Sequence, residues 1–226
     1  MENKSENKIC QNCKNDFVID TNDFNYYKKM DVLPPKMCPE CRAQLRLSFR
    51  NERFFYKRQC DNCKKNTLSM FSPNKPYPVW CNDCWWSNDL DNKQYGINYD
   101  KNVAFFEQVE EVFGKAVRPG LIGRNNIKSN YLNLTAESKN CYMVIEGSNN
   151  ENCVNCYWIQ LSKDLVDCSF TNKVELSYEV DDCYDSNNLK WCKGCHNCLD
   201  SSFLLNCRGC TNCLGCINLR GQKYNI

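Results

Sequence analysis

The sequence predicts a mixed α+β protein in which two small Cys₄ zinc ribbons precede a C-terminal β-solenoid with a 15-residue repeat. Two observations carry this prediction: the 226 residues include 20 Cys and a single His, and the cysteines follow two different spacing patterns. The length allows one or two domains with cores of their own. We divide the chain into a first ribbon with a basic helix (1–58), a second ribbon (59–98), an amphipathic linking helix (99–135) and the solenoid (136–226).

Composition also excludes several classes of function. With His196 as the single histidine, most of the chain lacks the parts of a Ser/His/Asp triad or a His-ligated catalytic metal. No acid/base pair, Gly-rich phosphate loop or nucleotide fingerprint is present, so we expect no enzyme and no small-molecule substrate. The residues after Met1 lack the apolar stretch of an export signal, and no run is apolar enough to span a membrane. We therefore expect a cytoplasmic protein, in which paired cysteines are metal ligands before they are disulfides.

Four CxxC pairs supply the ligands of the predicted ribbons. They are Cys10/Cys13, Cys38/Cys41, Cys60/Cys63 and Cys81/Cys84. A tetrahedral Cys₄ zinc needs two such pairs, and four thiolates leave no open position for catalysis. The sequence intervals favour sequential pairing into two structural Zn²⁺ sites, with crossed pairing as the alternative. A redox CxxC is less favoured because no βαβ pattern surrounds the pairs.

A basic segment follows the second pair. Residues 42–58, RAQLRLSFRNERFFYKR, contain no Gly or Pro, and Pro39 and Glu40 suit the first turn of a helix. The cationic side chains are spaced to form one stripe on that helix: Arg42, Arg46, Arg50, Arg53 and Lys57. Such a stripe is either a phosphate-contacting surface or a solvated helix face. Trp85 and Trp86 likewise either stack on nucleobases or cover the second zinc site.

The N-terminal motifs resemble those of a known group of proteins. The first segment has a CxxC pair, Phe17, an acidic-aromatic stretch at 23–27, Pro34-Pro35 and CPECR at 38–42, and the second has CDNCKK and PYPVWCNDCWW. They are similar to the treble-clef zinc ribbons of uncharacterised, cysteine-rich proteins of candidate-phyla bacteria, whose repeat region the closing NCLGCINLRGQKYNI also resembles. The resemblance implies zinc, a β-hairpin knuckle and a helix whose first turn supplies the second ligand pair. It implies no settled activity, and it makes this chain a short or truncated member.

The middle of the chain predicts one amphipathic helix over residues 99–118. Apolar residues recur there at three- and four-residue steps, and Gly114 is expected to stop the pattern. The helix either docks on a partner or caps the repeat array that follows.

The C-terminal part contains an internal repeat. Five cysteines, each preceded by Asn or Asp, are spaced 15 residues apart: Cys153, Cys168, Cys183, Cys198 and Cys213. A fixed period with aligned small and aliphatic positions predicts a β-solenoid, with three sides of about five residues each. One feature disagrees with ordinary strands, because inward-type residues recur at every third position rather than every second.

The cysteines of the repeat, including the dense run from Cys192 to Cys216, allow several chemical states. Free thiols buried as small apolar groups are the first expectation. Disulfides, an iron–sulfur cluster on the last four cysteines and a third zinc site with His196 are the alternatives.

Together these features predict a non-enzymatic, zinc-binding modular protein. The leading hypothesis is binding of RNA or single-stranded nucleic acid by the arginine stripe with Trp85 and Trp86. The alternative is a protein–protein interaction scaffold presented by the solenoid, and a redox or iron–sulfur role has the least support.

Overall fold

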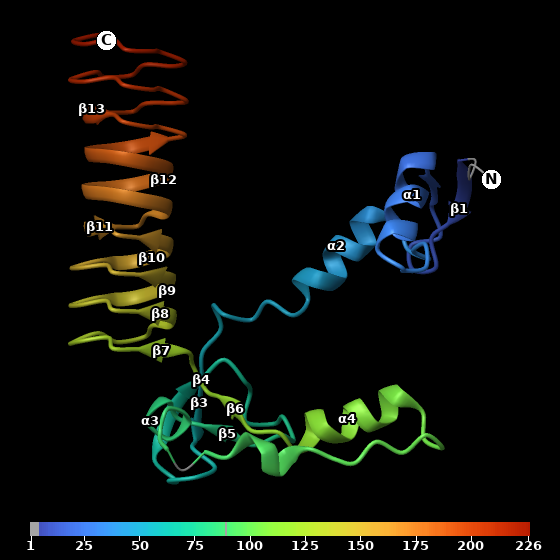
Figure 1. The fold of residues 1–226 in the computed structure, drawn as a ribbon. Coiled ribbons are helices and arrows are strands. Elements are labelled where there is room, and N and C mark those ends of the chain that lie inside the picture. The colour runs from blue at the N-terminus through green and yellow to red at the C-terminus, as the bar shows by residue number, and fades with distance from the viewer. Residues whose placement is uncertain (1–4, 89) are drawn as a thin grey trace. The chain divides into compact units, whose positions relative to one another are not determined.

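The computed structural model describes residues 5–88 and 90–226, which divide into two units, Met1–Asn51 and Glu52–Ile226. Figure 1 shows the helices and hairpins of the N-terminal half and the stacked coils of the C-terminal half. Each unit contains one Cys₄ group.

The first unit is a hairpin followed by two helices. Strands β1 (Glu6–Ile9) and β2 (Asp16–Ile19) pair antiparallel, and α1 (Thr21–Lys29) and α2 (Pro39–Leu47) follow. Asp20 caps α1 through a capping box with Asp23. Helix α2 starts with Pro39 in its first turn and ends at Leu47, where the Ser48 hydroxyl donates to the Leu45 carbonyl at 2.6 Å. The basic helix is therefore shorter than the sequence pattern predicts.

The second unit starts with another hairpin, β3 (Tyr56–Gln59) and β4 (Asn66–Ser69). The elements that follow are β5 (Val79–Trp80), α3 (Asn82–Trp85), the 3₁₀ helix η1 (Asn92–Tyr95), α4 (Phe105–Lys115) and β6 (Arg118–Pro119). Strand β5 pairs in parallel with β6, and the Met70 N–H donates to the Gly120 carbonyl at 2.8 Å. These bonds attach the region of the second Cys₄ group to the segment that enters the solenoid.

Helix α4 confirms the helix predicted between residues 99 and 118, although Gly114 lies inside it. Its buried polar residue, Gln108, bonds to the main chain of Asp100 and Val103. Phe105, Phe106 and Phe113 of α4 are exposed.

The C-terminal region is a parallel β-solenoid, as predicted (Figure 1). Its strands are β7 (Gly123–Arg124), β8 (Asn133–Ala136), β9 (Tyr142–Ser148), β10 (Val154–Gln160), β11 (Lys163–Val166), β12 (Ser169–Lys193) and β13 (Leu199–Ser202). The pairing begins at β7 with Gly123 opposite Thr135, upstream of residue 136.

The coil contains 12 residues, so the expected 15-residue coil is wrong. Residues paired in neighbouring coils are 12 apart, from Ile127↔Lys139 to Thr211↔Lys223. A 15-residue coil would place Cys168, Cys183 and Cys198 in one column, but with a register of 12 these cysteines do not stack on one another. The spacing of 15 reflects a shorter unit that divides both 12 and 15.

That unit is a triplet of residues. From Asn125 to Tyr224, every third residue has a positive φ, and the residue after it points into the coil. Four triplets close one coil, with a left-handed residue at each corner. Asn, Asp and Gly fill many of these corners because they adopt the left-handed conformation at least cost. The recurrence of inward-type residues at every third position of the sequence is thus the structural repeat of the solenoid.

The inward positions explain the use of cysteine. Buried thiols donate to the carbonyl two residues earlier, as in Cys153 Sγ to Glu151 O at 3.3 Å. Serine does the same, as in Ser162 Oγ to Gln160 O at 2.8 Å. Most inward positions hold a small side chain, and Cys suits them because it combines a weak donor with an apolar surface. Larger aliphatic residues such as Ile159 and Leu189 fill the remaining interior.

Within the described residues, no helix combines the length and apolar character that a membrane-spanning helix needs.

Candidate metal centres and an aromatic groove

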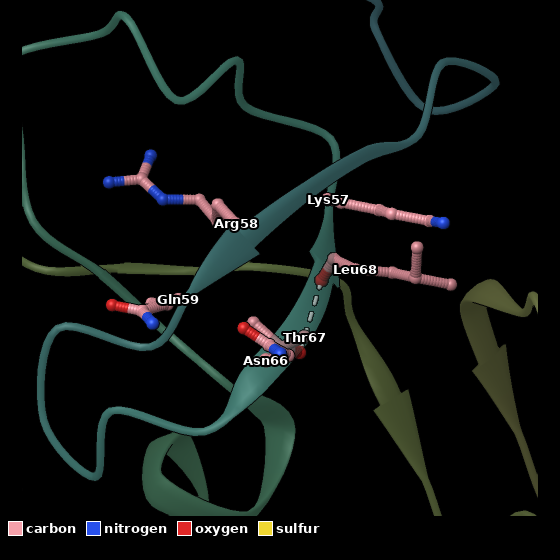
Figure 2. A pocket seen from close by; sticks show the side chains of 6 residues that line it. All are labelled: Lys57, Arg58, Gln59, Asn66, Thr67 and Leu68. Atoms are coloured by element: carbon pink, nitrogen blue, oxygen red, sulfur yellow. Dashed lines mark hydrogen bonds between the residues drawn. The ribbon is translucent and has the colours of Figure 1, made fainter.

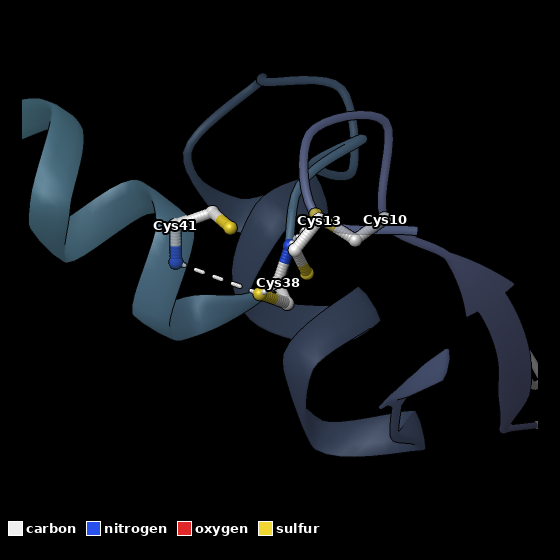
Figure 3. Close-up of side chains that lie close together, drawn as sticks. All are labelled: Cys10, Cys13, Cys38 and Cys41. Carbon is white, nitrogen blue, oxygen red and sulfur yellow. Dashed lines mark hydrogen bonds between the residues drawn. The ribbon is translucent and has the colours of Figure 1, made fainter. Parts of the chain in front are cut away.

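The first candidate centre is formed by Cys10, Cys13, Cys38 and Cys41, whose sulfur atoms all lie within 4.8 Å of one another (Figure 3). The first pair lies in the turn between β1 and β2. There the Lys14 N–H donates to the Cys10 carbonyl at 3.0 Å, and Lys14 has a φ of 65°. Cys38 is the N-cap of α2 and Cys41 lies in its first turn. The tight turn thus positions two thiols and the start of the helix positions two more, so that all four lie around one point.

The second candidate centre repeats this construction with Cys60, Cys63, Cys81 and Cys84. The knuckle lies between β3 and β4, where the Lys64 N–H donates to the Cys60 carbonyl at 3.0 Å. Cys81 is the N-cap of α3, which carries Cys84. Sequential pairing of the four CxxC motifs is therefore confirmed, and crossed pairing is wrong.

Sulfur spacing in both groups fits a tetrahedral ion. Cys13 Sγ lies 3.8 Å from Cys38 Sγ, and Cys63 Sγ lies 3.7 Å from Cys81 Sγ. A tetrahedron with metal–sulfur bonds of about 2.3 Å has sulfur–sulfur edges of about 3.8 Å. One printed edge of each group thus matches a tetrahedral metal site, and the four sulfur atoms of each group lie close enough together to hold one ion.

Main-chain N–H groups stabilise negative charge on one sulfur of each group. The Cys38 N–H donates to Cys10 Sγ at 3.2 Å, and the Cys81 N–H donates to Cys60 Sγ at 3.1 Å. Burial raises the pKa of the Cys10 thiol, but these and other N–H groups outweigh it and lower the pKa to about 6. The same balance of burial and N–H donors lowers the pKa of Cys60 to about 7. Each group thus contains one thiol ready to act as a thiolate ligand.

Four other thiols hold their protons more strongly than a free cysteine, because their pKa values are raised: Cys13, Cys38, Cys81 and Cys84. Burial and the neighbouring thiol of Cys84 raise the pKa of Cys81 to about 12. Because these thiols would have to ionise to become ligands, a metal ion that binds there releases protons.

The five residues of the predicted arginine stripe do not share one helix. Arg42 and Arg46 lie on α2, whereas Arg50, Arg53 and Lys57 follow its end at Leu47. Arg42 is half-buried and its Nε has no hydrogen-bond partner, while the Arg53 guanidinium lies 4.7 Å from the Tyr157 ring centre. The expectation of one continuous helical stripe is therefore wrong.

Lys57 lies on β3 beside a pocket of about 630 Å³ that the β3–β4 hairpin lines. Figure 2 shows its ammonium and the Arg58 guanidinium on opposite sides of the strand. Arg58 pairs with Asp61 at 3.1 Å, whereas Lys57 on β3 and Lys64 and Lys65 in the turn of the hairpin are exposed.

Trp86 differs from Trp85 in its surroundings. Trp85 is half-buried, whereas Trp86 is 50% exposed at the end of α3. The Trp86 indole donates to the Gly123 carbonyl at 2.9 Å and to Asn82 Oδ1 at 3.2 Å, which fixes its ring. The guanidinium of Arg124 lies 5.5 Å from the ring centre. The sequence pattern pointed to Trp86 but not to Arg124, because only the fold brings β7 beside α3.

We call the hollow around this ring the Trp86 groove. It has a volume of about 320 Å³ and is lined by Asn82, Asp83, Trp86, Gly123, Arg124 and Asn125. A second hollow of about 320 Å³ shares Asn82, Gly123 and Asn125 and continues onto the first coils. The groove thus joins an aromatic face, a cation and several amides on one surface.

The interior cysteines of the solenoid and His196 form no third centre of this kind among the described residues. His196 lies on the outside of the coil, where its ring contacts Tyr184 at a centroid distance of 4.9 Å. The thiols inside the coil are bonded to main-chain carbonyls instead.

Comparison with known proteins adds no assignment. No model of a known protein family matches the chain, and no curated protein matches it either.

Proposed function

We propose that this protein is a non-enzymatic binding protein for single-stranded nucleic acid, in which two zinc ions hold the ribbons in shape. The donor sets support zinc, because four thiolates at tetrahedral spacing suit a soft, redox-inactive ion. Four thiolates also complete the coordination shell, so the metal has a structural role.

Trp86 in its groove is the observation that carries the proposal. Its half-exposed ring offers a stacking surface for a base, and stacking tolerates every base because each has a π-face. Arg124 can meet a phosphate beside the stacked base. The amides of Asn82 and Asn125 and the carboxylate of Asp83 can meet base edges, since carboxylates accept from exocyclic amines. The nucleic-acid site thus moves from the predicted arginine stripe to the junction of ribbon and solenoid.

Binding of a fluorescein-labelled oligothymidylate, followed by anisotropy, tests this function. Trp86→Ala should weaken binding about fivefold or more, because stacking on one aromatic side chain contributes about 1–3 kcal/mol. Trp191→Ala is the matched control, since Trp191 is also exposed (43%) but lies on the solenoid away from the groove. Metal content and circular dichroism of each variant verify the fold. Equal losses in both variants, or no binding by the wild-type protein, would contradict the proposal.

An exposed apolar surface on the last coils favours a second candidate, the protein–protein scaffold. The rings of Trp191 and Phe203 stack at 4.8 Å, and Leu205, Leu214 and Ile217 are exposed on the same coils. A pull-down with and without nuclease separates the two functions. A partner that survives nuclease treatment and is lost in Phe203→Ser supports the scaffold, whereas a partner lost with nuclease supports the nucleic-acid function.

A further inference from the structure

One outward column of the solenoid starts in the Trp86 groove. The 12-residue register places nine residues in line along one side of the coils: Arg124, Ala136, Ser148, Gln160, Asn172, Tyr184, His196, Arg208 and Arg220. We call this line the Arg124 column. None of its members is acidic, and its cations lie at its two ends.

The end of the column at Arg208 and Arg220 contains two cations in neighbouring coils. Three ion pairs elsewhere on the solenoid join residues 12 apart, namely Lys139–Glu151 at 3.3 Å, Lys173–Asp185 at 3.7 Å and Lys193–Asp181 at 3.1 Å. Arg208 and Arg220 are instead paired directly with each other across neighbouring coils. Like charges in facing positions are destabilising. Within the described part of the chain neither guanidinium forms an ion pair, and both residues are exposed.

The surroundings of these two arginines leave them open to a ligand. Gly209 and Gly221 occupy the adjacent corner with positive φ and no side chain. The corner on the other side carries Asn206, whose amide donates to Asn218 at 2.8 Å. The surface around the two arginines therefore has no bulky side chains at the glycine corner, and it is polar and rich in hydrogen-bond donors.

Carboxylates in the flanking corners lie lower on the solenoid. Glu137 accepts from the Asn125 amide, and Asp185 pairs with Lys173 at 3.7 Å. Asp182 lies beside Tyr184, and burial together with this carboxylate raises the pKa of the Tyr184 hydroxyl. The arginines of the column are thus confined to its two ends, and the corners beside the members between them carry Glu137, Glu146, Asp182 and Asp185.

We infer that the Arg124 column is a track for the phosphate backbone of a single strand, which enters at the Trp86 groove and reaches Arg208 and Arg220. The inference rests on the proposed nucleic-acid function and adds a second contact region to it. Arg208 lies seven 12-residue steps beyond Arg124. With coils about 4.8 Å apart, the track is about 34 Å long. A strand with about 3.4 Å per nucleotide spans it with about ten nucleotides.

Two oligothymidylates, of 4 and 12 nucleotides, separate the groove from the track. The test variant is Arg208→Glu/Arg220→Glu, and Arg208→Gln/Arg220→Gln repeats the test without reversing charge. The control is Lys190→Glu/Lys223→Glu, which changes the net charge equally at exposed positions outside the Arg124 column.

The 12-mer should bind the test variant at least tenfold more weakly than it binds the wild type. It should bind the control variant at most about twofold more weakly than the wild type. The 4-mer should not distinguish the test variant from the control. Loss of two phosphate contacts should also lower the slope of log affinity against log salt by about 1.4.

An unchanged 12-mer affinity and salt slope in both arginine variants would overturn the track. The proposed function would still stand if Trp86→Ala weakened the 4-mer. If the wild-type protein bound neither strand, the function and the track would fail together.

Discussion

Replacement of Gly147 by alanine tests the 12-residue register directly. Gly147 is an inward residue of β9 and pairs with Ile159 of the next coil. A Cβ at this position would lie 2.3 Å from the Ile159 carbonyl oxygen and 2.9 Å from the Asn150 amide nitrogen. Both atoms are held in place, because the same amide donates to the same carbonyl at 2.9 Å.

The cost has two parts. Overpacking of a well-packed interior costs about 1–3 kcal/mol. Loss of the buried bond from Asn150 to Ile159 adds about 1–3 kcal/mol for the unsatisfied groups. We therefore expect Gly147→Ala to lower the free energy of unfolding by about 2–6 kcal/mol.

Urea unfolding followed by circular dichroism measures this change. Gly114→Ala is the control, since a Cβ there meets nothing within 4 Å and the residue lies inside α4. This control should be neutral or stabilising by up to about 1 kcal/mol. With a 15-residue coil, Gly147 would face Ser162 rather than Ile159. A Gly147→Ala variant as stable as the Gly114→Ala variant would refute the register.

Two further predictions concern the metals and the interior thiols. Purified protein should contain two zinc ions by elemental analysis, and Cys38→Ser should lower this to one and unfold the first unit, because such sites contribute about 10 kcal/mol or more to folding; two metals retained in this variant would contradict the site. Cys183, fully buried and donating to the Asp181 carbonyl at 3.5 Å, should tolerate Ala at a cost of about 1–2 kcal/mol in urea unfolding, whereas Asp should disrupt the coils by burying a charge. Exposed Lys190→Glu is the control, and equal stability of Cys183→Asp and Lys190→Glu would refute the interior placement.

The two Cys₄ groups could be predicted because the chemistry that forms them is local. Each CxxC motif determines its own turn, and a helix start is visible at Cys38-Pro39-Glu40 in the sequence. Which CxxC motifs share a metal site then follows from the number of residues between successive motifs. By contrast, no Gly or Pro marks the end of α2 at Leu47. The sequence therefore predicts a helix and an arginine stripe that continue to Lys57, beyond the observed end.

The size of the coil could not be read from the cysteines alone. The sequence shows that inward residues recur at every third position. The identity of the side chains does not determine how many triplets close a coil. That number depends on how far each left-handed corner turns the chain, which is a backbone property. Four corners give the 12-residue coil observed here, and five triplets happen to give the 15-residue spacing of the Asn/Asp–Cys motif. The Trp86 groove was likewise hidden, since Trp86 and Gly123 are 37 residues apart.

The mismatch between 15 and 12 has a consequence for how this chain tolerates insertion and duplication. Each further copy of a 15-residue unit adds one full coil and one extra side. Successive cysteines of the 15-residue spacing therefore lie on successive sides of the coil, and the fifth lies on the same side as the first. They are Cys153, Cys168, Cys183, Cys198 and Cys213. Gain or loss of 12 residues would preserve every outward column, whereas a change of one triplet would rotate everything beyond it by a quarter turn. A triplet gained or lost between Arg124 and Arg208 would therefore break the Arg124 column, because its two ends would then lie on different sides of the coil.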